Sequence, residues 1–127
     1  MAIKTTRYEA DDLTVHVITG PVVETEMYQA LETSSEEAPT TLVLWDMTLA
    51  EVAHITTDVL RRFVRKAAAI AGRRAGGRTA VIAPQDPQFG LARMSEAFTE
   101  LESSPVVLRA FRNRVEAVFW LRSAGPG

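Results

Sequence analysis

Cysteine is absent from this sequence of 127 residues, which excludes disulfides, thiolate nucleophiles and sulfur-ligated metal sites. The sequence also lacks a run of about 20 apolar residues, the length that a membrane-spanning helix requires. Its first residues, MAIKTTRYEADD, do not contain the apolar core of a signal peptide. We therefore expect a soluble protein in the cytoplasm, with no transmembrane segment.

Aromatic residues make up only 7% of the chain, while hydrophobic residues make up 46% and charged residues 24%. This balance is typical of globular domains. A chain of this length usually forms one domain. The sequence predicts a single domain over residues 1–122, followed by a frayed tail over residues 123–127.

Acidic residues are missing between Val59 and Gln85, although the net charge of the chain is only −2. Residues 1–58 contain eleven acidic and two basic residues, whereas residues 59–127 contain five acidic and twelve basic residues. The basic stretch predicts a candidate anion patch formed by Arg61, Arg62, Arg65 and Lys66. The alternative is a solvated helix face. Because aromatic residues do not interleave with these cations, nucleic acid is not expected as a partner.

Hydrophobic periodicity and turn residues predict elements in the order ββαβαβαβα. The first two strands flank a turn at residues 10–12 and are expected to form a hairpin. Later strands are predicted at residues 42–46, 79–83 and 106–108, and helices at about residues 24–37, 56–70, 86–101 and 113–121. Because a strand, helix, strand unit prefers a right-handed crossover, its two strands should pair in parallel. The predicted fold is a single-domain α/β protein with a mixed sheet and helices packed on it.

Short polar side chains mark the starts of the later helices. Thr56 or Thr57 can cap the second helix, and Asp58 would favour the positive end of its dipole. The pairs that open the third and the last helix are Asp86 with Pro87 and Asn113 with Glu116.

No convergent set of catalytic or metal-ligating side chains can be assembled from the sequence. His16 is predicted on the polar side of the second strand, and His54 lies in a connection without a second ligand at metal-binding spacing. The glycine-rich segment at residues 72–79 follows a helix and precedes a strand, the reverse of a phosphate-binding loop, so we expect a helix end and a turn. We predict no catalytic residue, no metal, no cofactor and no enzyme activity.

Polar side chains cluster where the predicted strands end and the following helices begin. In open α/β sheets, ligands and partners usually bind at this edge. The candidate interaction edge consists of Asp46, Thr48, Asp58, Gln85, Asp86 and Gln88, next to Thr56 and Thr57. The alternative is that these residues only cap helices and form turns.

Several segments of the chain resemble the STAS superfamily, named for sulfate transporters and anti-sigma factor antagonists. They are LVLWD at 42–46, ITTDVL at 55–60, TAVIAP at 79–84, DPQFGLARM at 86–94 and AFRNRVEAVFWL at 110–121. The chain looks most like small stand-alone bacterial proteins that resemble both STAS and CRAL-TRIO lipid-transfer domains. This resemblance implies a STAS-like fold for nearly the whole chain.

The resemblance also implies a site. In anti-sigma factor antagonists, a partner kinase phosphorylates a serine or threonine at the start of the second helix. By this resemblance Thr56 and Thr57 stand near the phosphoacceptor position, and Asp46 matches the acid that ends the preceding strand. The family has aspartate and then serine where this chain has His54-Ile55-Thr56-Thr57. A phosphate there would add about −1.5 to −2 charges where the helix dipole is positive.

The leading expectation is a non-enzymatic, STAS-like interaction or regulatory module that binds a protein partner, with phosphorylation control at Thr56 or Thr57. The alternative is a small-molecule or lipid-binding domain of the CRAL-TRIO-like type, which would take a small anionic or lipid ligand. A homodimer formed through the C-terminal helix or a sheet edge is a further expectation.

Overall fold

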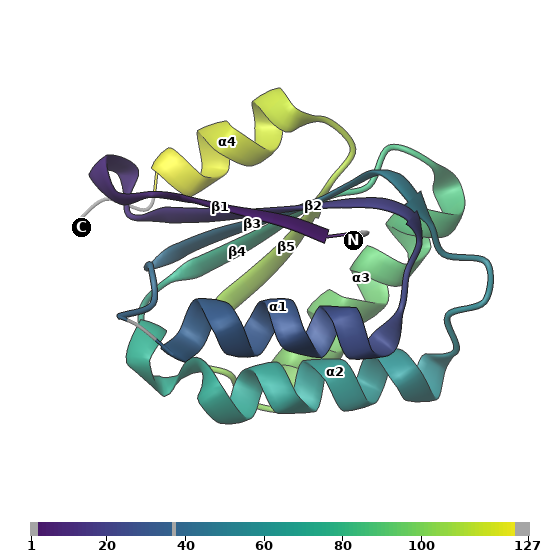
Figure 1. Ribbon diagram of the computed structural model, residues 1–127, viewed down its shortest axis with the longest axis horizontal. Coiled ribbons are helices and arrows are strands. Elements are labelled where there is room, and N and C mark those ends of the chain that lie inside the picture. Colours follow the sequence, from purple (N-terminus) through teal and green to yellow (C-terminus); the bar gives the residue numbers. More distant parts are fainter. Residues whose placement is uncertain (1–2, 37, 124–127) are drawn as a thin grey trace.

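A five-stranded sheet forms the centre of the computed structural model, which describes residues 3–36 and 38–123 (Figure 1). The strands lie side by side in chain order: β1 (Ile3–Tyr8), β2 (Leu13–Pro21), β3 (Leu42–Glu51), β4 (Arg78–Ile82) and β5 (Val107–Phe111). β1 and β2 form the predicted antiparallel hairpin, and every later neighbouring pair is parallel. The predicted mixed sheet and element order are confirmed.

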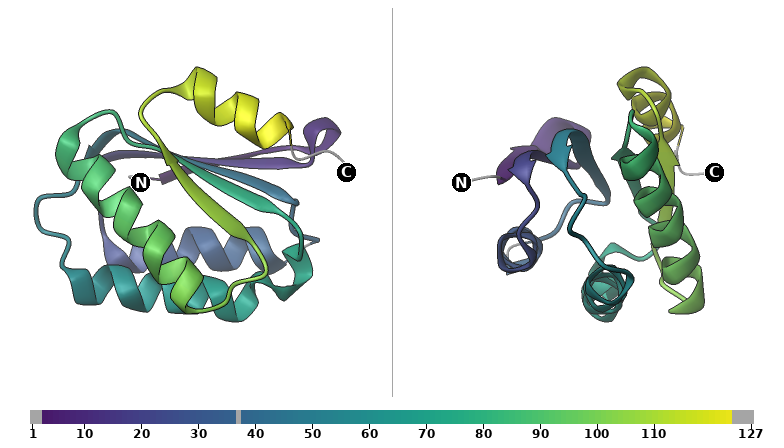
Figure 2. Two further views of the ribbon diagram at one scale, coloured as in Figure 1. Left: turned by 180° about the vertical axis from the view of Figure 1, so that it is seen from behind. Right: turned by 90° about the vertical axis from the view of Figure 1, so that its right-hand side faces the viewer.

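The helices cover both faces of the sheet (Figures 1 and 2). One face carries α1 (Glu24–Glu36), α2 (Thr57–Ile70) and α3 (Asp86–Leu101), and the other carries α4 (Arg114–Arg122). The crossovers containing α1, α2 and α3 all step in the same direction along the sheet, so right-handed connections place these helices on one face. α4 follows the last strand and packs on the opposite face. Short 3₁₀ segments, Glu9–Asp11 and Ala71–Arg74, precede β2 and β4.

Consecutive residues of β3 point to opposite faces of the sheet, which explains why its first half is continuously apolar. Val43 and Trp45 belong to the core on the face of α1, α2 and α3, whereas Leu44 belongs to the smaller core under α4. All of them are buried. The sheet therefore separates two apolar layers, and the larger layer holds the cavity described below.

The predicted end of the third strand at Asp46 is wrong, because β3 continues to Glu51. β2 runs alongside it past a bulge, and Gly20 pairs with Ala50 near the end of both strands. This pairing gives strand geometry to residues 47–51, for which the sequence predicts a connection. Thr48 consequently lies inside a strand.

Of the capping box predicted for α4, the N-cap is confirmed, since the Glu116 N–H donates to Asn113 Oδ1 at 2.9 Å. The described residues show no return hydrogen bond from the Asn113 N–H to the Glu116 side chain. The prediction that Asp86 caps α3 is wrong by one residue. Gln85 is the N-cap, and its N–H donates to Gln88 Oε1 at 3.1 Å. A side chain inside the helix thus satisfies the backbone donor of the residue that precedes it.

The glycine-rich segment between α2 and β4 forms the predicted helix end and turn. Gly76 has a φ of +84°, and a Cβ atom at Gly77 would collide with the carbonyl oxygen of Thr41. Both positions therefore favour glycine. Of the predicted tail, Ser123 is the C-cap of α4, while residues 124–127, like residue 37 at the predicted end of the first helix, lie outside the described residues.

Candidate functional site

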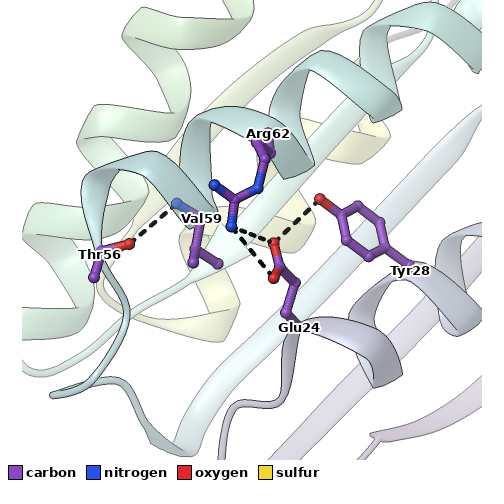
Figure 3. A network of polar contacts seen from close by, with 5 residues as sticks. All are labelled: Glu24, Tyr28, Thr56, Val59 and Arg62. Atoms are coloured by element: carbon purple, nitrogen blue, oxygen red, sulfur yellow. Dashed lines mark hydrogen bonds and ion pairs between the residues drawn. The ribbon is translucent and has the colours of Figure 1, made fainter.

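The start of α2 presents the hydroxyl groups of Thr56 and Thr57 at the surface. Figure 3 shows Thr56 with its hydrogen-bond partner. Thr56 is the N-cap, and its Oγ1 accepts a hydrogen bond from the Val59 N–H at 3.2 Å. Thr57 and Asp58 follow in the first helical turn, and residues 56–58 are all exposed. Of the two predicted capping residues, Thr56 is the one that makes the cap hydrogen bond.

An ion pair next to this site ties α1 to α2 (Figure 3). Arg62 Nη2 lies 3.2 Å from Glu24 Oε2, and the Tyr28 hydroxyl donates to the same oxygen at 3.3 Å. Desolvation, followed by the Glu24 carboxylate, raises the pKa of Tyr28, so the hydroxyl keeps its proton and remains a donor. Because Arg62 is largely exposed, water screens this pair, and it fixes geometry more than it adds stability.

The other cations of the candidate anion patch also have neighbours. Arg65 Nε lies 3.6 Å from Glu102 Oε2, and Lys66 Nζ lies 3.5 Å from Glu32 Oε1. The Arg61 guanidinium lies over the Phe98 ring, 5.4 Å from its centre. With Arg62 paired to Glu24 as well, three of these four cations have an acid beside them. The patch therefore attracts an anion less strongly than its sequence suggests.

Asp46 lies on the other side of the sheet from the start of α2. Its Oδ1 accepts hydrogen bonds from the Thr48 N–H at 3.0 Å and the Thr48 hydroxyl at 2.6 Å. Its Oδ2 lies 3.6 Å from Arg114 Nη1 on α4. The structure therefore groups Asp46 and Thr48 with α4, and does not bring them together with Thr56.

The remaining residues of the candidate interaction edge have structural contacts. Gln88 is buried, and its Nε2 donates to the Ala50 carbonyl at 2.9 Å, which ties the start of α3 to the end of β3. Asp86 Oδ1 lies 2.9 Å from Arg112 Nη1. Gln85 and Asp86 are exposed, whereas the amide of Gln88 is used inside the molecule.

α4 exposes apolar side chains on its outer side. Val115 is 79% exposed and Phe119 76% exposed, whereas Ala117 and Leu121 pack against the sheet. α4 is the C-terminal helix through which a homodimer is expected to form from the sequence. The homodimer stays a prediction.

No three His, Asp or Glu side chains gather as a metal site would require within residues 3–36 and 38–123. His54 Nε2 donates instead to the Val22 carbonyl at 2.6 Å. None of the described helices has the length and apolar character needed to span a bilayer.

A cavity of about 130 Å³ lies between the sheet and α1, α2 and α3. Apolar side chains form most of its wall, among them Val43, Trp45, Phe63, Leu91 and Leu108. Near the C-terminal end of α2 and at the start of the 3₁₀ segment that follows it, the lining includes Ala67, Ala68 and Ala71. Small side chains on a helix face that would otherwise carry leucine leave room between the layers. Sequence reasoning missed this cavity, and the alanines were its only signal.

His16 is buried beside the cavity, so its predicted place on a polar side of the strand is wrong. Only 1% of its surface is exposed. Its ring stacks on Trp45 with 4.0 Å between centres, and its Nδ1 lies 2.8 Å from Thr5 Oγ1. Burial, assisted by the positive charge of Arg74, lowers the pKa of His16 to about 4. The imidazole is therefore neutral at pH 7.

Arg74 lines the cavity and is held by carbonyl and hydroxyl oxygens. Its Nε donates to the Thr40 carbonyl at 2.9 Å, and its Nη2 donates to Thr79 Oγ1 at 3.1 Å and to the Thr41 and Arg78 carbonyls, both at 3.0 Å. Partial burial lowers the pKa of Arg74 to about 10, although the negative charge of Asp12 acts in the opposite direction. Arg74 is therefore positively charged at pH 7. No carboxylate of the described residues lies within ion-pair distance of it.

No protein-family model and no curated protein matches this chain. Similar solved structures include an uncharacterized protein from the DUF3478 family with a SpoIIAA-like fold, from Shewanella loihica PV-4. It is 20% identical, with a TM-score of 0.60 over 94% of this chain and 92% of that chain. Another is the anti-sigma factor antagonist SpoIIAA in its unphosphorylated form, which is 12% identical, with a TM-score of 0.50 over 95% of this chain and 98% of that chain.

The chain has a STAS-like, SpoIIAA-like fold, as the sequence resemblance implied. At these levels of identity the likeness concerns the fold, and the role of the chain has to be argued from its own residues. Neither structure supports the CRAL-TRIO part of the resemblance.

Proposed function

We propose that the chain is a non-catalytic regulatory module that binds a protein partner through the start of α2, with phosphorylation at Thr57 or Thr56 as the switch. The observation that carries the proposal is the pair of exposed hydroxyl groups at the first positions of this helix. The likeness of the fold to an anti-sigma factor antagonist supports the same surface.

Thr57 is the better acceptor of the two. The Thr56 hydroxyl accepts the cap hydrogen bond from Val59, whereas Thr57 is exposed and makes no side-chain hydrogen bond to another described residue. A phosphate on Thr57 would lie at the positive end of the α2 dipole and one helical turn before Arg61. It would change the charge of the surface by about −1.5 to −2 without removing the cap.

Affinity purification from the native host tests this proposal. We expect Thr57→Ala to remove a retained phosphate from the intact mass and to change the yield of one partner by about fivefold or more, the lower end of typical couplings. Thr25→Ala is the matched control, because Thr25 is an exposed threonine on α1. Unchanged partner yield in the double variant Thr56→Ala, Thr57→Ala would show that this surface is not the switch.

The cavity supports a second candidate function, the binding of a small molecule between the sheet and the helices. An engineered apolar cavity of about 150 Å³ takes up benzene, so a space of about 130 Å³ has room for a molecule of that size. Native mass spectrometry of the protein from its own host, followed by denaturation, should reveal a stoichiometric mass that leaves on unfolding. A bare chain in both spectra would count against this function.

A further inference from the structure

We infer that the cavity binds a small apolar carboxylic acid, with the carboxylate beside Arg74 and the hydrocarbon body against the apolar wall. This inference rests on the second candidate function and names the chemical class of its ligand. It is carried by the shape of the cavity and by two polar groups at its lining, the half-buried Arg74 and the buried His16.

The apolar part of the cavity fits a compact hydrocarbon group. Trp45 and Phe63 meet edge to face beside it, with ring centres 5.8 Å apart, and offer aromatic surface to a ligand. The volume of about 130 Å³ is close to that of a cavity that holds one benzene ring. A long acyl chain would exceed this space, so the ligand is expected to be short or to contain a single ring.

Arg74 gives the polar part of the cavity a positive charge. No described carboxylate forms an ion pair with it, and the acid that acts on it, Asp12, only partly offsets the effect of burial on its pKa. Removing an arginine from water, even in part as here, is costly unless its charge is compensated. The carbonyl and hydroxyl oxygens around Arg74 satisfy Nε and Nη2, and Nη1 makes no hydrogen bond to another described residue. A ligand carboxylate beside Nη1 would give this nitrogen an acceptor and give Arg74 a direct ion pair, which Asp12 does not provide.

His16 restricts the charge of the ligand. Its Nδ1 is satisfied by Thr5, whereas its Nε2 makes no hydrogen bond to another described residue, although the side chain is buried and lines the cavity. A neutral imidazole offers this atom for a hydrogen bond without adding a second positive charge. The lining thus compensates one negative charge, which favours a monocarboxylate over a dianion such as a phosphate monoester.

A two-ligand titration tests the inference on the unmodified chain. Benzoate and toluene share a ring, and only benzoate carries a carboxylate. In ¹H–¹⁵N NMR spectra at pH 7, we expect benzoate to shift signals around Arg74, Thr79 and His16 and to bind about tenfold or more tightly than toluene, because a hydrogen bond to a charged group is gained. Equal sodium chloride in all samples removes the effect of ionic strength.

Variants then locate the site. Ala67→Leu fills the cavity and should weaken both ligands, whereas Ala69→Leu is the matched control, because Ala69 is an exposed residue of the same helix. Arg74→Met should reduce benzoate binding about tenfold, to the level of toluene. Since Arg74 holds the chain around β4, Arg74→Met can fail to fold, and the comparison of the two ligands on the unmodified chain then decides.

Three results would overturn the inference, and each has its own meaning. Equal affinity for benzoate and toluene would leave a ligand-binding cavity but remove the carboxylate class. Benzoate binding that is insensitive to Ala67→Leu and shifts only surface arginine signals would place the anion outside the cavity. If neither ligand binds, the inference fails, and native mass spectrometry of the protein from its own host decides separately on the second candidate function.

Discussion

His16 is a neutral imidazole inside the larger core, and burial makes its protonation costly. The ring is stacked on Trp45 and hydrogen-bonded through Nδ1, and Arg74 is the charged group that acts on it. Its pKa of about 4 in the folded chain lies below the ordinary value of 6.5. Between these two pH values, His16 binds a proton in the unfolded chain but not in the folded chain. The contribution of His16 to the free energy of unfolding is therefore fully present above pH 6.5 and is lost as the pH falls toward 4.

We predict that the free energy of unfolding falls by about 2 kcal/mol between pH 7 and pH 5 through His16 alone. Urea denaturation at the two pH values measures this loss. His16→Gln should remove most of the pH dependence, whatever its effect on absolute stability, and His54→Gln should retain it. The same pH dependence in His16→Gln and in the unmodified chain would mean that His16 is not the titrating group.

The sequence misplaced His16 because its pattern is ambiguous. The pattern resembles a strand with one solvent-exposed face, because apolar Leu13, Val15 and Val17 alternate with polar Thr14 and His16. Both faces of β2 are in fact covered, because β2 lies inside the sheet with α1 to α3 on one side and α4 on the other. The polar character of Thr14 and His16 could not reveal that their face of β2 lines a buried cavity.

At the scale of elements, two neighbouring threonines at the start of α2 have different roles. Thr56 caps the helix, whereas Thr57 is the proposed phosphate acceptor. We predict that Thr56→Ala lowers the free energy of unfolding by about 1 kcal/mol, the usual effect of losing an N-cap hydrogen bond. Thr57→Ala should change it by less than about 0.5 kcal/mol, as surface substitutions usually do. Denaturant unfolding of both variants, with Thr25→Ala as the exposed control, measures the difference.

A comparable loss in Thr56→Ala and Thr57→Ala would contradict this separation of roles. With the predicted difference, an effect of Thr57→Ala on partner binding could not be attributed to a weakened helix. The stability measurement is therefore the control that the phosphorylation experiment needs.

Features that depend on residues close in the sequence were predicted well, whereas features that depend on pairing with a distant strand were not. The cap of α4 needs only Asn113 and Glu116, and it is confirmed. The second half of β3 depends on β2, more than 25 residues earlier in the chain, and Thr48 was therefore assigned to a loop. Tertiary pairing overrode a local sequence that resembles a connection.

At the scale of the molecule, the charge asymmetry of the sequence becomes an asymmetry in space. Because the strands lie in chain order, the acidic first part of the chain lies toward the β1 edge of the sheet and the basic second part toward the β5 edge (Figure 2). The ion pairs of Arg62 with Glu24 and of Lys66 with Glu32 join α2 to α1 across this division. The sequence shows the charge asymmetry, but only the strand order shows that the charges separate along the sheet from β1 to β5.

The space between the sheet and α2 gives the last prediction. Ala67→Leu adds apolar atoms where the layers leave a cavity, so it should raise the free energy of unfolding by about 1 kcal/mol, as cavity-filling substitutions commonly do. Ala69→Leu adds the same atoms on the exposed side of α2 and should change it by less than about 0.5 kcal/mol. Urea denaturation of the two variants measures both effects. If Ala67→Leu instead destabilises the fold, the layers are already closely packed and the space is too small for a ligand. If the variant is stabilised and no longer binds benzoate, the unmodified chain has a lower free energy of unfolding because its cavity is kept open for a ligand.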